Sequence, residues 1–205
     1  MAESPNQWLM LTPAGALRAF GQAQPDAPAA HLQSLLAADR SWERQAWLQS
    51  RQLQPCDLDA WVLAGSVEVL PRPLQGPDAR LDDFLQHVVA ALSGERRAAL
   101  ASESGFCLGS SGMTQDEADA LSAAAADFSE FARRQTRRGW AGASRYVAFH
   151  SDAEMLVPDT VMLPFWVDSV GYWLILQGEP LLNNPALVEL VWGIQEAGSR
   201  FQPRG

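Results

Sequence analysis

The alternation of hydrophobic and polar positions between residues 104 and 135 predicts a strand, a turn and a long helix. Residues 105–108 form a short apolar run, and residues 109–112 consist only of glycine and serine. Thr114 follows, with Glu117 three positions later, which is the spacing of a capping box at the start of a helix. Apolar residues then recur at steps of three and four and share one helix face: Ala118, Leu121, Ala125, Phe128 and Ala132.

This helix face is rich in alanine, and the pattern is compatible with packing against either of two partners. Small side chains let a neighbouring element approach closely, because the distance between packed elements depends on the side chains at the contact. One interpretation is ordinary packing on the chain's own sheet. The other is a helix that also packs against its copy in a dimer. The pattern leaves both interpretations open.

The segments around this helix extend the alternation of helices and strands from about residue 80 onward. Residues 80–92 predict an amphipathic helix, and Asn184 followed by Pro185 predicts the start of a last helix. Strands are predicted at residues 97–102, 105–108, 145–150, 154–157, 161–167 and 171–177. Pro164 indicates an edge or a bend, and the last run, GYWLILQ, is the most apolar and predicts a central strand. The short connections favour an α+β fold in which helices flank an antiparallel sheet.

Residues 1–70 differ from this pattern and predict a small, mostly helical module. Thr12, Ser41 and Asp57 are candidate helix caps, and residues 65–70 alternate as a strand does. Three short helices followed by a β element resemble a winged-helix module in pattern.

A proline-rich stretch separates the two regions. Residues 71–78 read PRPLQGPD, a sequence that resists both helix and sheet. The predicted organisation is therefore a winged-helix-like module at 1–70, a linker at 71–79 and an α+β domain at 80–205.

Charge limits the partners that the chain can have. The net charge is −9, the pI is about 4.7, and all 15 basic residues are arginine. Without lysine, a phosphate-loop lysine and a Schiff-base lysine are excluded. In a winged helix the groove-binding helix would lie near residues 57–64, which carry Asp57 and Asp59 and no basic residue. We therefore expect a protein-binding or structural role rather than DNA binding, and keep a transcriptional or ligand-responsive regulator as the alternative.

Candidate chemistry is sparse. Three histidines and two cysteines show no metal-ligand spacing, so we expect no metal and no cofactor. Cys107 and His150 are the one nucleophile and base pair to consider, but Cys107 lies in an apolar run typical of inert packing. We expect a protein without enzymatic activity. Its few cysteines, the absence of a signal-like start and the lack of an apolar run of about 18 residues predict a cytoplasmic protein with no membrane span.

The order of elements from residue 80 to 200 resembles the roadblock family, named for a dynein light chain. The resemblance rests on GFCLGSSG followed by TQDEADALSAAAADF, in which residues 121–124 occupy the small-residue core of the helix, and on the strands RYVAFH and GYWLIL. It implies a roadblock/profilin-like order α-β-β-α-β-β-β-α. The first seventy residues lie outside the family pattern, and the segment at 156–168 is longer than usual.

The resemblance also implies a function. Roadblock proteins are scaffolds without enzymatic activity that form homodimers, and bacterial members often regulate a small Ras-like GTPase in signalling or motility complexes. In such dimers the helix packs on its mate and the following strand pairs across the two-fold axis. Carried over, the implied dimer interface is Ala118, Leu121, Ala125, Phe128, Arg145, Val147 and Phe149.

The stretch GEPLLNNP before the last helix has two interpretations. Asparagine at such a place commonly caps a helix end. The alternative is a partner contact made by Glu179, Asn183 and Asn184.

Overall fold

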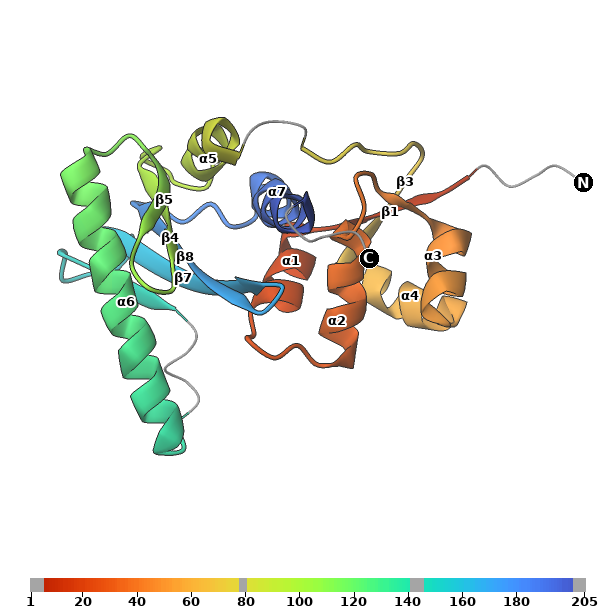
Figure 1. Cartoon of the computed structure of the whole chain (residues 1–205), viewed down its shortest axis with the longest axis horizontal. Helices are drawn as coiled ribbons and strands as arrows, with labels where there is room; N and C mark the ends of the chain where they lie inside the picture. Colours follow the sequence, from red (N-terminus) through yellow and green to blue (C-terminus); the bar gives the residue numbers. More distant parts are fainter. Residues whose placement is uncertain (1–5, 78–80, 141–145, 201–205) are drawn as a thin grey trace, which may run out of the picture.

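Two antiparallel sheets organise the chain, whose computed structural model describes residues 6–77, 81–140 and 146–200 (Figure 1). The smaller sheet has the strand order β2-β1-β3 and the larger one the order β5-β4-β8-β7-β6. The strands are β1 (Trp8–Leu11), β2 (Trp42–Glu43), β3 (Val67–Leu70), β4 (Ala98–Ser102), β5 (Cys107–Ser111), β6 (Val147–Phe149), β7 (Thr160–Val167) and β8 (Val170–Gln177). The helices are α1 (Pro13–Phe20), α2 (Ala27–Gln33), α3 (Arg44–Arg51), α4 (Pro55–Leu63), α5 (Leu81–Ala90), α6 (Gln115–Arg137) and α7 (Ala186–Arg200), with a short 3-10 helix η1 (Ser34–Leu36) after α2.

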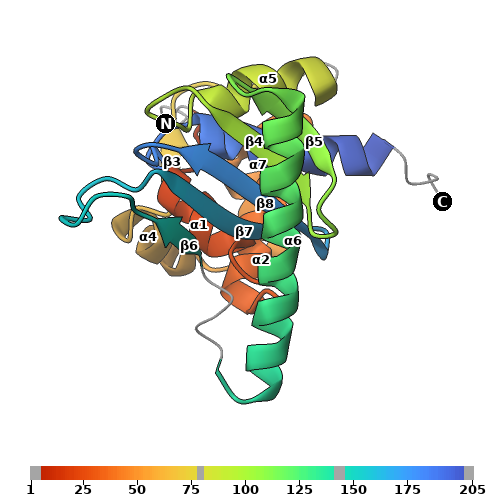
Figure 2. The same cartoon turned by 90° about the vertical axis from the view of Figure 1, so that its left-hand side faces the viewer.

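The larger sheet has helices on both faces. From α5 to α7 the chain order is helix, two strands, helix, three strands, helix, which confirms the predicted α+β order. α6 crosses one face, whereas α5 and α7 lie on the other (Figures 1 and 2). Alternate strand residues supply the two cores, since successive side chains point to opposite faces. Leu100 and Leu174 join the cluster with α5 and α7, whereas Ala101 and Trp173 join the cluster with α6.

β8 is confirmed as a central strand, while two other strand predictions were wrong. β5 continues to Ser111, so most of the predicted Gly/Ser turn is strand. Backbone pairing of Ser111 with Ala98 depends little on side chains, which is why this polar stretch can belong to a sheet. Residues 154–157 form no strand, because Met155 has a left-handed backbone with φ of 53° and its N–H donates to Asp152.

Pro164 shows why the prediction of an edge was partly right. β7 lies inside the sheet between β8 and β6. However, β6 pairs only with residues 160–162 of β7, so Pro164 lies beyond the end of that pairing. Its missing N–H therefore costs no ladder hydrogen bond on the β6 side.

α6 begins where the capping pattern predicted. The Thr114 hydroxyl accepts a hydrogen bond from the Glu117 N–H at 3.3 Å. The helix has 23 residues, and its C-terminal half projects past the sheet (Figure 2). Its surface is strongly charged, and within the described residues no helix combines the length and the hydrophobicity needed to cross a bilayer.

The N-terminal region contains helices as predicted, but its sheet is organised around a strand that the sequence analysis missed. β1 is the middle strand, pairing with β2 and β3. Two predicted caps were wrong in detail: Ser41 instead accepts a hydrogen bond from the Leu74 N–H, and Asp57 lies inside α4 and accepts from the Gln54 N–H. The winged-helix likeness stays a prediction.

One hydrophobic cluster joins the N-terminal region to the larger sheet. It contains Leu9 and Trp47 from the first region together with Phe165 and Trp192 from the second. Trp192 on α7 also donates its indole N–H to the carbonyl of Ala38 at 2.8 Å. α7 thus packs against both regions and fixes them to each other.

Candidate interaction surface

The alanine-rich face of α6 lies on the chain's own sheet. Ala118 and Ala125 are fully buried in a cluster with Ala99, Ala101 and Ile175. Leu121 and Phe128 are half-buried against the same cluster. The alanines of β4 allow the close approach, so the first interpretation of this face is correct. Ala118 and Ala125 are therefore core residues of the single chain and expose no surface to a second copy.

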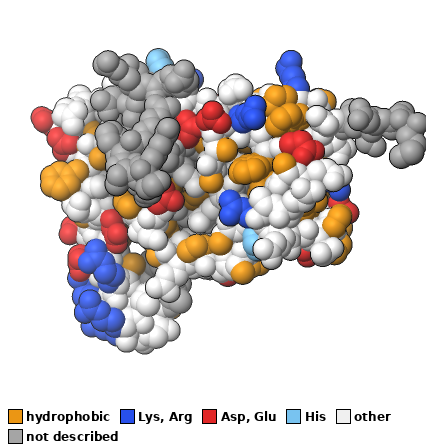
Figure 3. Space-filling view, turned by 45° about the vertical axis from the view of Figure 1, so that its right-hand side comes forward, with side chains coloured by type: hydrophobic (Ala, Val, Ile, Leu, Met, Phe, Trp, Pro, Cys, Tyr) orange, Lys and Arg blue, Asp and Glu red, His pale blue; other side chains and the backbone are white. Residues whose placement is uncertain are grey.

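The outward face of α6 carries segregated charges. Exposed acidic residues occupy the first two thirds and arginines the last third, with two exposed alanines between the acidic residues. Figure 3 shows arginine side chains gathered at the projecting end of the molecule, with acidic side chains above them. The residues are Asp116, Asp119, Ala120, Ala123, Asp127 and Glu130, then Arg133, Arg134, Arg137 and Arg138. Asp116 in the first turn and Arg134 and Arg137 in the last turn have the signs that suit their ends of the helix dipole.

Exposed aromatic side chains lie beside this face. Phe131 is 38% exposed and meets Trp140, which is 55% exposed, edge to face at 6.2 Å between ring centroids. Phe128 lies 5.8 Å from Phe149, which is 43% exposed on β6. Val147 on the same strand is half-buried, and Arg145 of the predicted interface lies outside the described residues.

β6 places these aromatics at a sheet edge. It is the last strand in the order of the larger sheet, and its ladder within the described strands is with β7 alone. An edge strand presents unpaired N–H and C=O groups that can pair with another chain. The exposed aromatics and the open edge together form what we call the α6–β6 surface, defined by Phe131, Trp140, Val147 and Phe149.

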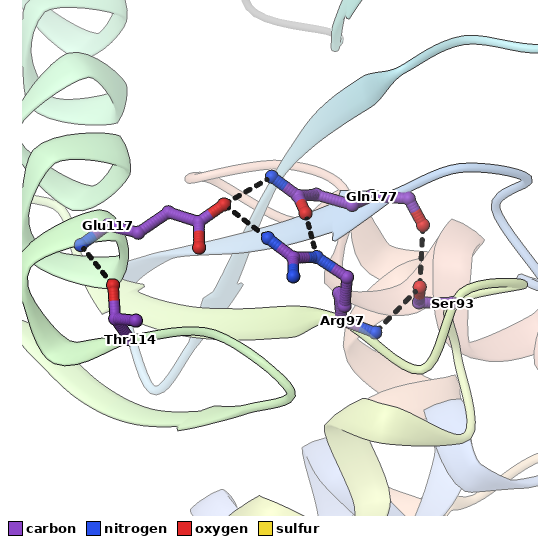
Figure 4. A network of polar contacts seen from close by, with 5 residues as sticks. All are labelled: Ser93, Arg97, Thr114, Glu117 and Gln177. Atoms are coloured by element: carbon purple, nitrogen blue, oxygen red, sulfur yellow. Dashed lines mark hydrogen bonds and ion pairs between the residues drawn. The ribbon is translucent and has the colours of Figure 1, made fainter.

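A polar network fixes the start of α6 to the sheet (Figure 4). The Arg97 guanidinium donates to the side-chain oxygens of Gln177 and Glu117, and the Gln177 amide donates to the same Glu117 oxygen at 3.0 Å. The Ser93 hydroxyl donates to the Gln177 carbonyl at 2.6 Å and accepts from the Arg97 N–H at 3.1 Å. The hydrogen bond from Gln177, and then the contact with Arg97, hold the pKa of Glu117 below its ordinary value although partial desolvation opposes them.

The residues predicted as a partner contact lie at this same end of the sheet. Asn184 caps α7, because its side chain accepts from the Ala186 N–H at 3.0 Å and donates to the Ala91 carbonyl at 3.1 Å. Glu179 and Asn183 have exposed side chains, so the partner contact stays a prediction for these two.

A neighbouring loop adds an apolar tip that sequence analysis did not single out. The Gly178 N–H donates to the Asp159 carbonyl at 2.9 Å, which joins the β6–β7 loop to the β8–α7 loop. The tip of the β6–β7 loop is Met155, Leu156 and Val157, and Leu156 is 76% exposed. We call this end, with Glu179 and Asn183, the loop surface.

The other candidate sites receive no support from their surroundings. α4 exposes Asp57 and Asp59, and its last residue, Leu63, is 91% exposed, so this helix presents an acidic and apolar surface unsuited to phosphate. Cys107 and His150 belong to opposite edges of the five-stranded sheet, which are roughly 19 Å apart at the usual strand spacing and too far for a nucleophile and its base. Among the described residues no group of three or more His, Cys, Asp or Glu side chains is placed to hold a metal.

Comparison with known proteins gives structural likeness only. No family model and no curated protein sequence matches this chain. A Roadblock/LC7 domain from Streptomyces avermitilis is similar with a TM-score of 0.38 and 17% identity, over 60% of this chain and 96% of that one. Myxococcus xanthus MglB is similar with a TM-score of 0.41 and 13% identity, over 64% of this chain and 98% of that one.

Proposed function

We propose that this protein is a homodimeric scaffold without enzymatic activity, and that two copies meet through the α6–β6 surface. The observation that carries the proposal is a pair of aromatic contacts beside an open strand edge: the exposed Phe131 with the exposed Trp140, and the half-buried Phe128 with the exposed Phe149. Aromatic side chains exposed on a rigid element are typical anchors of protein interfaces.

The charges on α6 support an antiparallel arrangement of the two copies. If the two helices cross near their middles, Asp116 and Asp119 of one copy approach Arg134 and Arg137 of the other. A parallel arrangement would instead bring like charges together along the whole helix. Antiparallel pairing also places Phe131 of one copy against the small exposed alanines in the acidic half of the other.

A charge exchange tests this dimer. One variant carries Arg134→Glu and Arg137→Glu, and the other carries Asp116→Arg and Asp119→Arg. We expect each variant alone to dimerise at least about tenfold more weakly than the natural chain, because four ion pairs become four repulsions. An equimolar mixture should recover the dimer, since each acidic half then meets a basic half. Sedimentation equilibrium from about micromolar to 100 micromolar concentration measures this.

The mixture is the internal control of this experiment. Both variants also oppose the helix dipole, but a loss of helix stability cannot be repaired by mixing two unstable chains. Circular dichroism of each variant records that effect separately. A natural chain that is monomeric over the whole range would contradict the proposed dimer, and variants that dimerise normally would contradict the antiparallel arrangement.

The partner class comes from the roadblock resemblance of the sequence, which implies a small Ras-like GTPase. The loop surface is our candidate contact, because Met155, Leu156 and Val157 are exposed and fixed at their base by the Asp159 hydrogen bonds. Isolated exposed apolar residues are common, but three in a row at a loop tip favour a docking role.

Capture from lysate of the source cell tests the partner class, with a GTP analogue or GDP added in parallel. We expect a small GTPase to be retained in one nucleotide state, and Leu156→Asp to reduce the retained amount about tenfold. Leu63→Asp is the matched control, since Leu63 is also a highly exposed leucine but lies on α4. Recovery that is equal in both nucleotide states would exclude nucleotide-dependent regulation, and equal losses in both variants would exclude the loop surface.

A further inference from the structure

A cavity lies at the junction between the N-terminal region and α7. Its volume is about 460 Å³, which is within the range of sites that hold small organic molecules. Met10 and Leu11 of β1, Leu74 of the connecting segment, and Val188 and Trp192 of α7 form most of its wall. Sites of this kind are preferentially found where two structural units meet.

Hydrogen bonds hold the walls of this cavity in place. Ser41 and Leu74 are joined twice at 2.9 Å, once between backbone groups and once through the serine hydroxyl. The Gly76 N–H donates to the Asp39 carbonyl at 2.7 Å. Trp192 is held by its indole hydrogen bond to Ala38. The cavity is therefore formed before any ligand enters, which lowers the ordering cost of binding.

Gly76 shows how closely the connecting segment approaches α7. A Cβ atom at this position would lie 2.5 Å from a carboxylate oxygen of Glu196, 3.0 Å from the indole of Trp192 and 3.1 Å from the Asp39 carbonyl. Only glycine allows this approach without a shift of the backbone or of the indole. The segment is thus fitted to α7 rather than spanning the gap loosely.

The charged residues that line the cavity have one sign. Among the described residues they are Glu68 on β3 and Glu189 on α7, both with exposed side chains, and no described arginine lines the cavity. The apolar wall favours a hydrocarbon or aromatic body, and the two carboxylates favour a positive end group. We propose that this cavity binds a small hydrophobic cation, with an aromatic or aliphatic body against Met10, Leu74 and Val188 and a protonated amine between Glu68 and Glu189.

Three probes of similar shape test the proposal on the full chain: naphthylethylamine, naphthylethanol and the anion of naphthylacetic acid. Isothermal titration and NMR chemical shifts of the tryptophan indole groups measure their binding. We expect the amine to bind about tenfold more tightly than the acetate, with the alcohol between them, because the carboxylates attract one and repel the other. Perturbation of the Trp192 indole signal would place the probe in this cavity.

Two variants separate charge from shape. Glu68→Gln with Glu189→Gln should bring the three affinities within about twofold of each other while the alcohol still binds. Leu74→Trp should abolish binding of all three by filling the cavity, and circular dichroism checks its fold. Glu179→Gln is the control, since this exposed carboxylate does not line the cavity.

Absence of binding at millimolar probe, equal binding of amine and acetate, or binding that survives Leu74→Trp would each overturn the proposal. The proposal does not depend on the dimer, so either can fail alone.

Discussion

The two faces of α6 have similar small residues but opposite surroundings. Ala118 and Ala125 are completely buried on the sheet, whereas Ala120 and Ala123, two turns or less away, are exposed. The difference lies in the neighbouring strands, since β4 offers alanines to one face and nothing described covers the other. A helix face of small residues therefore indicates close packing against a neighbouring element. Whether that element belongs to the same chain or to another depends on the tertiary structure.

The largest expected effect on stability comes from enlarging an alanine on the buried face of α6, compared with the same change on the exposed face. Ala125→Leu should lower the free energy of unfolding by about 1–3 kcal/mol, because the close-packed interface with β4 has no room for an isobutyl group. Ala123→Leu should change it by less than about 0.5 kcal/mol, since the side chain enters solvent. Urea denaturation of both variants measures the difference, and equal losses would mean that the two faces are not distinct in the way described.

Trp173→Phe tests the sheet side in a second way. The indole N–H of Trp173 donates to the Ser129 hydroxyl of α6 at 2.8 Å, and both residues are buried. Loss of the donor and of ring volume should cost about 1–2 kcal/mol of unfolding free energy. Trp140→Phe, on the exposed side, is the matched control and should cost less than about 0.5 kcal/mol. A neutral result for Trp173→Phe would show that this hydrogen bond does not help to hold α6.

Phe131→Ser tests the outward side. The folded monomer should keep its stability within about 0.5 kcal/mol, because Phe131 is already partly in water. The proposed dimer should weaken about tenfold, which is a common effect of removing an interface anchor. Phe106→Ser is the control, because Phe106 is a more exposed ring at the β4–β5 turn. Sedimentation equilibrium compares the three chains, and equal dimerisation would remove Phe131 from the interface.

The smallest expected effect concerns the polar network at the start of α6. The pKa of Glu117 is lowered in the folded chain, so its ionised form stabilises the fold at pH values above its ordinary pKa of 4.5. That stabilisation is lost as the pH falls through the lower pKa of the folded state. Glu117→Gln should therefore lower Tm at pH 7, and the gap to the natural chain should close as the pH falls below 4.5. Asp127→Asn is the control, and a gap that is independent of pH would assign the effect to packing instead.

Local signals in the sequence predicted much of the fold. The predicted caps at Thr114 and Asn184 and the predicted central strand GYWLILQ were confirmed. Each of these signals is carried by side chains within a few residues of one another. β1 was missed because four apolar residues without a periodic pattern fit a strand or a helix equally well. Its partners are decided by distant residues, since Trp8 pairs with Glu43 and with Leu70.

The candidate surfaces were harder to predict than the fold. The alanines of α6 were noted, but whether they meet β4 or a second copy depends on tertiary packing that no local pattern contains. The division of charge along α6 could have been read directly from residues 116–138, and it points to the outward face. The tip of the β6–β7 loop was predicted as a strand at 154–157, and its exposure could not be predicted because it depends on how Asp159 is bonded to the distant Gly178.

The hydrogen bond between Trp192 and Ala38 joins residues that are 154 positions apart in the sequence. A ribosome makes the N-terminal region long before it makes α7, so that region leaves the exit tunnel with part of its hydrophobic core uncovered. Closing such a distant contact requires a large loss of chain entropy, which slows folding relative to proteins built from local contacts. The nascent chain must therefore be protected from aggregation until its last helix arrives, and molecular chaperones act on intermediates of this kind.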